Sequence, residues 1–83
     1  MSTKLFVGSL PWSIDDEELK KTFENQGTVV SAKVIRDRDT GRSRGFGFVE
    51  MENSTDAQNA IQALNNSELN GRNIVVNEAK SRD

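Results

Sequence analysis

The side chains of residues 44–51 alternate in a way that predicts a β-strand with two different faces. One face begins and ends with a charged residue and holds, in order, Arg44, Phe46, Phe48 and Glu50. Because charged side chains stay in water, we expect both aromatic rings to lie on a solvated surface. Exposed rings beside an arginine are typical of a platform on which a flat ligand stacks. The alternative is a buried strand in which both rings belong to the core.

The opposite face of this strand holds Gly45 and Gly47, and glycine weakens a strand because it packs no side chain. We expect both glycines to allow a helix to pack closely behind the sheet. The strand would then separate an open aromatic face from a face covered by helices.

Three other segments have strand-like patterns, namely residues 4–10, 28–36 and 74–77. In the first, Lys4 and Phe6 share a face, so Phe6 is also expected to be exposed, and Pro11 ends the strand. In the second, Lys33 marks the register that it shares with Ile35 as the one facing solvent.

Two segments have the spacing of amphipathic helices. In the first, Leu19 and Phe23 are spaced i, i+4, which places Phe23 in the core. We expect Ser13 to be the N-cap of this helix, with Asp16 as its capping-box partner, and Gly27 to be the C-cap.

The second helix is expected to be capped by Ser54 or Thr55, with Gln58 as the capping-box partner of Thr55. Its core-facing stripe consists of Ala57, Ala60, Ile61 and Leu64. The pair Asn70–Gly71 is a strong turn signal before the last strand.

The remaining segments carry less specific signals. Trp12 is expected to cover the edge of the core, with contact to a ligand as the alternative. The acidic run at residues 15–18 suits the first turn of a helix, which favours a structural role over a metal site. Residues 37–43 form a polar turn that does not fit a calcium loop, because the twelfth loop position is Phe48 and not Glu.

The elements follow the order β-α-β-β-α-β, and two apolar helical stripes need one shared sheet face for burial. We therefore predict an α+β fold, a ferredoxin-like sandwich with a four-stranded antiparallel sheet and two helices on one face. Right-handed crossovers imply the strand order 4-1-3-2, which brings Phe6 beside Phe46 and Phe48 on the open face. We expect a single domain over residues 1–83, with a core at residues 4–80.

The composition excludes several kinds of chemistry. The chain has 83 residues, a net charge of −2 and neither cysteine nor histidine. Disulfides, thiolate or imidazole metal sites and Ser-His nucleophiles are therefore absent, so we expect no cofactor, no metal and no enzymatic activity. Five basic and two acidic side chains lie between residues 33 and 44, which gathers positive charge beside the aromatic strand. No apolar run approaches membrane-spanning length and no signal peptide is visible, so we expect an intracellular protein.

Two short segments resemble the signatures of a known family. Residues 44–51, Arg-Gly-Phe-Gly-Phe-Val-Glu-Met, resemble the octapeptide signature of the RNA recognition motif, and Leu5–Leu10 resembles its hexapeptide signature. Met51 replaces the usual final aromatic residue, and Ser9 stands where Asn is common. The compact chain is similar to small single-domain proteins of bacteria and cyanobacteria, and to the domain of glycine-rich cold-inducible proteins.

The resemblance implies a role for each matching residue. Phe6 and Phe48 would each stack a base, Phe46 would insert between the two sugars, and Arg44 would bridge a phosphate. The other candidate RNA-binding residues line the same face or its C-terminal edge, and are Lys4, Lys33, Ile35, Val75, Asn77, Ala79 and Lys80.

The function implied by the resemblance is binding of single-stranded RNA, with single-stranded DNA as an alternative ligand, in post-transcriptional regulation or RNA chaperoning. The main competing hypothesis is a protein-interaction module that binds peptides, and the third is a small phosphatase on a related fold. We expect a cytoplasmic location, with the nucleus or a plastid as the eukaryotic alternatives, weak protein partners as a secondary expectation, and no membrane partner.

Overall fold

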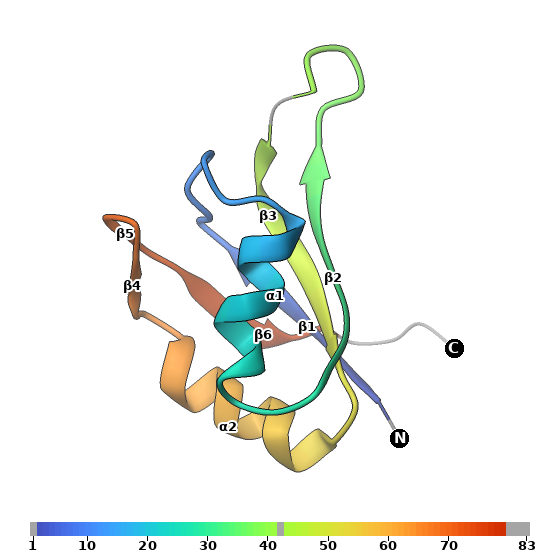
Figure 1. The fold of residues 1–83 in the computed structure, drawn as a ribbon. Helices are drawn as coiled ribbons and strands as arrows, with labels where there is room; N and C mark the ends of the chain where they lie inside the picture. The colour runs from blue at the N-terminus through green and yellow to red at the C-terminus, as the bar shows by residue number, and fades with distance from the viewer. Residues whose placement is uncertain (1, 42, 80–83) are drawn as a thin grey trace.

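The computed structural model describes residues 2–41 and 43–79, in which two helices pack against a four-stranded sheet (Figure 1). A second sheet has two short strands and lies beyond the end of the second helix. In chain order the elements are β1 (Thr3–Gly8), α1 (Asp16–Glu24), β2 (Val29–Arg36), β3 (Ser43–Met51), α2 (Ser54–Leu64), β4 (Glu68–Leu69), β5 (Arg72–Asn73) and β6 (Val75–Glu78).

The four-stranded sheet has the order β2-β3-β1-β6, and all of its neighbouring strands are antiparallel. Both helices cover the same face of this sheet, which leaves the other face free of helices (Figure 1). This arrangement confirms the predicted ferredoxin-like fold and the predicted strand order, with β1 and β3 as the central pair.

The hydrophobic core lies between the sheet and the two helices. Leu19 and Phe23 of α1 are completely buried, as the i, i+4 spacing predicted. From the sheet, the alternate residues that face the helices are also buried, namely Leu5, Val7, Val34, Val49, Met51 and Val76. The stripe of α2 is confirmed as well, because Ala57 and Ala60 are buried and Ile61 and Leu64 pack against the core.

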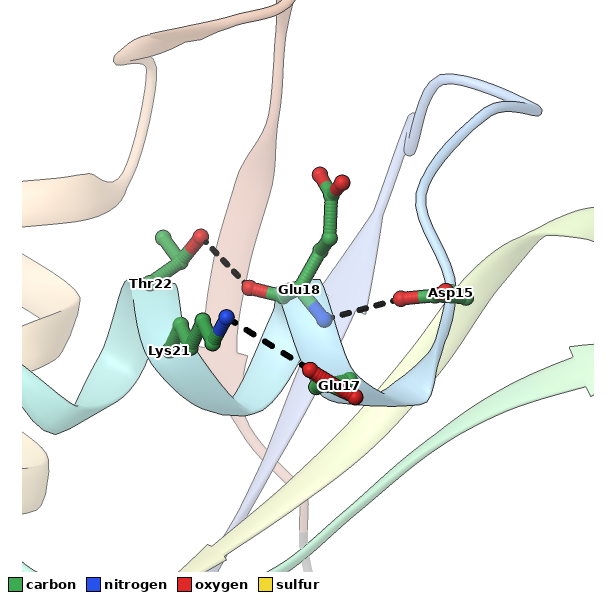
Figure 2. Close-up of polar contacts among 5 residues, drawn as sticks. All are labelled: Asp15, Glu17, Glu18, Lys21 and Thr22. Carbon is green, nitrogen blue, oxygen red and sulfur yellow. Dashed lines mark hydrogen bonds and ion pairs between the residues drawn. The ribbon is translucent and has the colours of Figure 1, made fainter.

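Helix α1 begins later than predicted, and its N-cap is Asp15 rather than Ser13. The Asp15 backbone is extended, and its Oδ1 accepts a hydrogen bond of 2.9 Å from the N–H of Glu18 (Figure 2). Ile14 is buried, so the chain must first insert this side chain into the core before the helix can begin. An aspartate immediately after the buried residue is then in the right place to accept from the first turn.

Asp16 has a different partner from the one predicted for it. Its Oδ1 accepts a hydrogen bond of 2.7 Å from the N–H of Val34, which connects α1 to strand β2.

At the other end of the helix, the C-cap is Asn25 in a right-handed helical conformation, so the prediction of Gly27 as the C-cap is wrong. Gly27 instead lies in the following turn, with a φ of +155°.

The N-cap of α2 also differs from the prediction. Asn53 occupies the cap position with an extended backbone, and its side chain makes no capping hydrogen bond. Ser54 and Thr55 already belong to the helix. The end of this helix is held by backbone and side-chain bonds, because Ser67 donates from both its N–H and its hydroxyl group to the carbonyl oxygen of Leu64.

Gly47 and Gly45 are required for different reasons. A Cβ at Gly47 would lie 3.3 Å from Cδ2 of Leu19 in α1, which agrees with the predicted close approach of a helix, but it would lie closer still, at 2.5 Å, to the Lys33 carbonyl oxygen of the neighbouring strand β2. A Cβ at Gly45 would meet nothing closer than 3.9 Å, so the same prediction is wrong there. Gly45 is needed for its φ of +86°, a conformation that a Cβ atom disfavours.

The boundaries of the strands differ from the predictions by one or two residues. β1 ends at Gly8 rather than residue 10, because Ser9 has a φ of +56° and turns the chain. The last strand begins at Val75, one residue later than predicted. The Asn70–Gly71 turn is confirmed, with φ values of +49° and +89°, and it joins the short strands β4 and β5, which the sequence did not predict.

We expect Phe23→Ala to lower the free energy of unfolding by about 3–5 kcal/mol, because it removes a completely buried ring and leaves a cavity. Chemical denaturation followed by circular dichroism measures this loss. The matched control is Phe48→Ala, which removes a ring of the same kind from the face that no helix covers. It should lower the free energy of unfolding by only about 1 kcal/mol. Equal losses in the two variants would show that Phe48 belongs to the core.

Candidate nucleic-acid interface

Three phenylalanine rings form a cluster on the face of the sheet that no helix covers, and we call this cluster the aromatic platform. Its members are Phe6, Phe46 and Phe48, and each is half-buried. The Phe6 ring centroid lies 5.8 Å from the centroid of Phe46 and 5.8 Å from that of Phe48. The Phe46 and Phe48 centroids are 6.3 Å apart, with their rings perpendicular. These are favourable tilted and edge-to-face contacts, so the rings support one another while one side stays open.

The pairing of β1 with β3 brings the platform together from two distant parts of the chain. Phe6 stands directly opposite Phe48, and Gly8 stands opposite Phe46. Gly8 has no side chain to compete with the rings, so the Phe6 ring extends along β1 above it. The prediction that the three rings share one face is thus confirmed. The alternative, a buried strand with both rings in the core, is wrong.

Lys4 places a positive charge beside one ring of the platform. Its Nζ lies 5.6 Å from the centroid of the Phe48 ring, within the range of a cation–π contact. Lys4 is exposed and pairs across the strands with Glu50, which accepts a hydrogen bond from the Ser2 hydroxyl group. The edge of the platform next to Phe48 therefore carries both a positive and a negative group.

The neighbouring strands bring further candidate residues to the platform. Lys33 of β2 is exposed and stands opposite Phe48, and Ile35 is half-buried two residues further along that strand. On the other side, Asn77 of β6 is exposed and stands opposite Phe6.

Val75 and Ala79 complete the side of the platform formed by β6 and its continuation. Val75 stands opposite Gly8 and is half-buried, while the N–H of Ala79 donates a hydrogen bond of 2.9 Å to the Lys4 carbonyl oxygen. For two other candidate residues the structure describes no side-chain position. Arg44 belongs to β3 but its side chain lies outside what the structure describes, and Lys80 lies outside the described residues altogether.

The sequence-based interpretation of Trp12 was wrong. It was expected to cover the edge of the core, yet it is 70% exposed, more than any other large apolar side chain in the described residues. The buried positions around it are taken by Leu10, Pro11 and Ile14. These three apolar neighbours were the available signal, because they gave the core edge other apolar side chains to bury than the indole ring.

Other kinds of site find little support in the residues that the structure describes. Within residues 2–41 and 43–79, no group of three or more acidic side chains gathers in a way that could hold a metal ion. Over the same ranges, neither helix is long and apolar enough to cross a membrane.

Comparisons with known proteins agree with this geometry. The family model of the RNA recognition motif matches residues 5–75. Glycine-rich RNA-binding protein 4, mitochondrial, of Arabidopsis thaliana is 55% identical over 82 residues, which are 99% of this chain and 60% of that protein. The crystal structure of RNA binding protein PG1 matches with a TM-score of 0.92 and 47% identity, covering 98% of each chain. The Sxl-lethal protein/RNA complex matches with a TM-score of 0.91 and 31% identity, covering 100% of this chain and 50% of that one.

An antiparallel sheet with helices on one face and an open aromatic cluster on the other defines a class of small α+β binding domains. The family match extends over most of the chain and includes both strands of the platform. The chain belongs to the RNA recognition motif family. It spans 23% of the length of the chloroplastic 29 kDa ribonucleoprotein of Arabidopsis thaliana and 60% of the length of the mitochondrial glycine-rich protein.

We expect Gly8→Ala to displace the Phe6 ring with a loss of only about 1 kcal/mol in stability. A Cβ at Gly8 would lie 2.9 Å from Cε2 and 3.3 Å from Cζ of Phe6, and the end of a side chain can move away. NMR contacts between residue 8 and the Phe6 ring, together with urea denaturation, measure both effects. The matched control is Gly47→Ala, which should cost more because its Cβ meets the backbone of Lys33. An unmoved Phe6 ring in Gly8→Ala would contradict the expectation.

Proposed function

We propose that this domain binds single-stranded RNA by stacking successive bases on the aromatic platform. The observation that carries the proposal is the convergence of Phe6, Phe46 and Phe48 on a sheet face that no helix covers. The match to a structure described as a protein/RNA complex supports it. Family membership supports it independently of the geometry.

Stacking supplies most of the binding energy in this proposal. Each base stacked on an aromatic side chain contributes about 1–3 kcal/mol, so two bases contribute roughly 2–6 kcal/mol. A net charge of −2 limits the contribution of long-range attraction to a polyanion. The bases of a duplex are paired and cannot lie flat on the platform, so single strands are the preferred ligand.

We assign roles to the residues of the platform as follows. Phe6 and Phe48 each stack one base, and Phe46 lies between the two sugars. Lys4, which is close to the Phe48 ring, contacts the phosphate of the stacked nucleotide. Arg44 contacts a second phosphate.

The remaining candidates recognise the edges of the bases or the backbone around the platform. Asn77 offers an amide group beside Phe6, where it can donate and accept hydrogen bonds. The other residues in this group are Lys33, Ile35, Val75, Ala79 and Lys80. The stacking surface accepts ribose and deoxyribose strands alike, so single-stranded DNA is a weaker alternative ligand.

The proposal extends to the biological setting. We infer a non-enzymatic domain that occupies residues 1–83 and acts in post-transcriptional regulation or RNA chaperoning. We place it in the cytoplasm, with a plastid as the alternative, because three relatives are named as chloroplastic and two as mitochondrial. Fractionation of the source cells tests the compartment, because recovery with purified organelles would overturn the cytoplasmic assignment.

We expect Phe48→Ala to weaken RNA binding by about 1–3 kcal/mol, roughly fivefold to 150-fold, because it removes one stacking surface. The measurement is a titration of randomised single-stranded RNA octanucleotides, followed by the NMR shifts of backbone amides. Gln62→Ala, which changes an exposed residue of α2, is the control and should bind like the unmodified protein. Unchanged affinity in the Phe48 variant would remove the platform as the binding surface. Binding of peptides with no response to RNA would instead favour a protein-interaction module.

The salt dependence of binding tests the balance between stacking and charge. With two or three phosphate contacts, the slope of log affinity against log salt concentration should be about −1.4 to −2.1. Fluorescence anisotropy of a labelled octanucleotide across a range of salt concentrations measures this slope. A slope steeper than about −4 would show that the basic segment, and not the platform, dominates binding.

A further inference from the structure

Glu50 places a negative charge on the face of the sheet that carries the aromatic platform. It follows Phe48 by two residues on β3 and stands between Val49 and Met51, which are completely buried, so its side chain lies on the open face. The residue is half-buried there. Because an acidic group opposes the approach of a polyanion, this carboxylate weakens the binding of any RNA strand unless a base contacts it.

A structural role as the ion-pair partner of Lys4 does not account for Glu50. The two residues stand directly opposite each other on β1 and β3. Within the part of the chain that the structure describes, however, no ion pair joins them, and Lys4 Nζ lies instead 5.6 Å from the centroid of the Phe48 ring. The group that holds the carboxylate is neutral, because the Ser2 hydroxyl donates a hydrogen bond to Oε2 of Glu50.

Glu50 is close enough to Phe48 to contact a base that stacks on this ring. Two residues of a strand span about 7 Å, and their side chains stand on the same face. The reach of a side chain from this level of the sheet is shown by Lys4, which starts opposite Glu50 and extends to the Phe48 ring. A base is wider than the contact with one ring requires, so its polar edge can lie over the neighbouring Glu50 position.

The chemistry of a carboxylate separates one kind of base edge from another. An ionised carboxylate accepts hydrogen bonds and donates none, and its two oxygens retain acceptor capacity after the bond from Ser2. Cytosine carries a donor, the N4 amino group, where uracil carries an acceptor, the O4 oxygen, and a glutamate that accepts from N4 of cytosine is a standard pairing with a base edge. A carboxylate beside the stacking ring therefore attracts the first edge and repels the second.

We propose that Glu50 selects the base that stacks on Phe48, by accepting a hydrogen bond from an exocyclic amino group. This inference rests on the proposed function and adds base selectivity to it. Cytosine and adenine each bring an amino group to the carboxylate, whereas uracil brings its O4 oxygen and is disfavoured. The octapeptide signature of the family leaves the residue type open at this position, so the selectivity comes from the residue that this chain has there.

A thermodynamic cycle of two proteins and two RNA ligands measures the contact. The ligands are octacytidylate and octauridylate, which offer the same number of stacking registers, and the variant is Glu50→Gln, whose amide can donate as well as accept. The preference for octacytidylate over octauridylate should be about tenfold larger in the unmodified protein than in Glu50→Gln, as expected for one charge-assisted hydrogen bond. Fluorescence anisotropy of end-labelled octanucleotides gives each dissociation constant, and differences in stacking between the two bases cancel in the cycle.

A second measurement needs no variant at all. The NMR signal of the Glu50 side-chain carboxyl carbon should shift when octacytidylate saturates the unmodified protein, and should shift much less with octauridylate. A purely structural role of Glu50 would give the same response to both ligands.

The matched control for charge is Glu24→Gln. Glu24 is the exposed last residue of α1, so this variant removes the same charge from the helix layer and should leave the preference for octacytidylate unchanged. Urea denaturation should show that Glu50→Gln is as stable as the unmodified protein, because the amide oxygen still accepts from Ser2.

The outcomes distinguish this inference from the proposed function. If Phe48→Ala weakens the binding of both octanucleotides but Glu50→Gln leaves their ratio of affinities unchanged, the platform stands and the selectivity of Glu50 is wrong. An equal change of this ratio in Glu24→Gln would assign the effect to net charge and also overturn the inference. If neither octanucleotide binds, or if Phe48→Ala binds both as the unmodified protein does, the proposed function itself fails and the inference fails with it.

Discussion

The antiparallel register between β1 and β3 is the constraint on which the rest of the structure depends. It sets Leu5 opposite Val49 on the helix-covered face and Phe6 opposite Phe48 on the open face. Burying each aliphatic side chain contributes about 1.5–3 kcal/mol, so the core holds this register firmly. A slip of one residue would bury the rings and expose the aliphatic residues. The aromatic platform is thus positioned by the core on the other side of the same strands.

The open face avoids much of the cost of displaying aromatic rings because the rings contact one another. Each ring of the platform is half-buried, with centroid distances of 5.8, 5.8 and 6.3 Å. Lys4 covers part of Phe48, and exposed polar residues stand on the neighbouring strands. A surface of this kind has polar groups at its edges and an apolar centre on which a flat ligand can stack.

Charge and stacking have separate places in this molecule. Acidic side chains cover the start of α1, where they suit the helix dipole and accept backbone hydrogen bonds at Asp15 and Asp16. Exposed basic side chains lie along β2 and the turn after it. Positive charge is therefore gathered at the β2 side of the sheet and negative charge at the start of α1, within a chain of net negative charge.

The sequence by itself determined the order of the elements, the open face of Phe6, Phe46 and Phe48, and the burial of Phe23, because alternation and helical periodicity are local properties. The caps of both helices and the role of Gly45 depended on where the chain enters the core and on backbone angles, which composition does not encode. Trp12 shows the difference most clearly. Its residue type suits a core edge as well as an exposed surface, and only the tertiary structure showed that the ring is 70% exposed, because the buried positions of this loop belong to Leu10, Pro11 and Ile14.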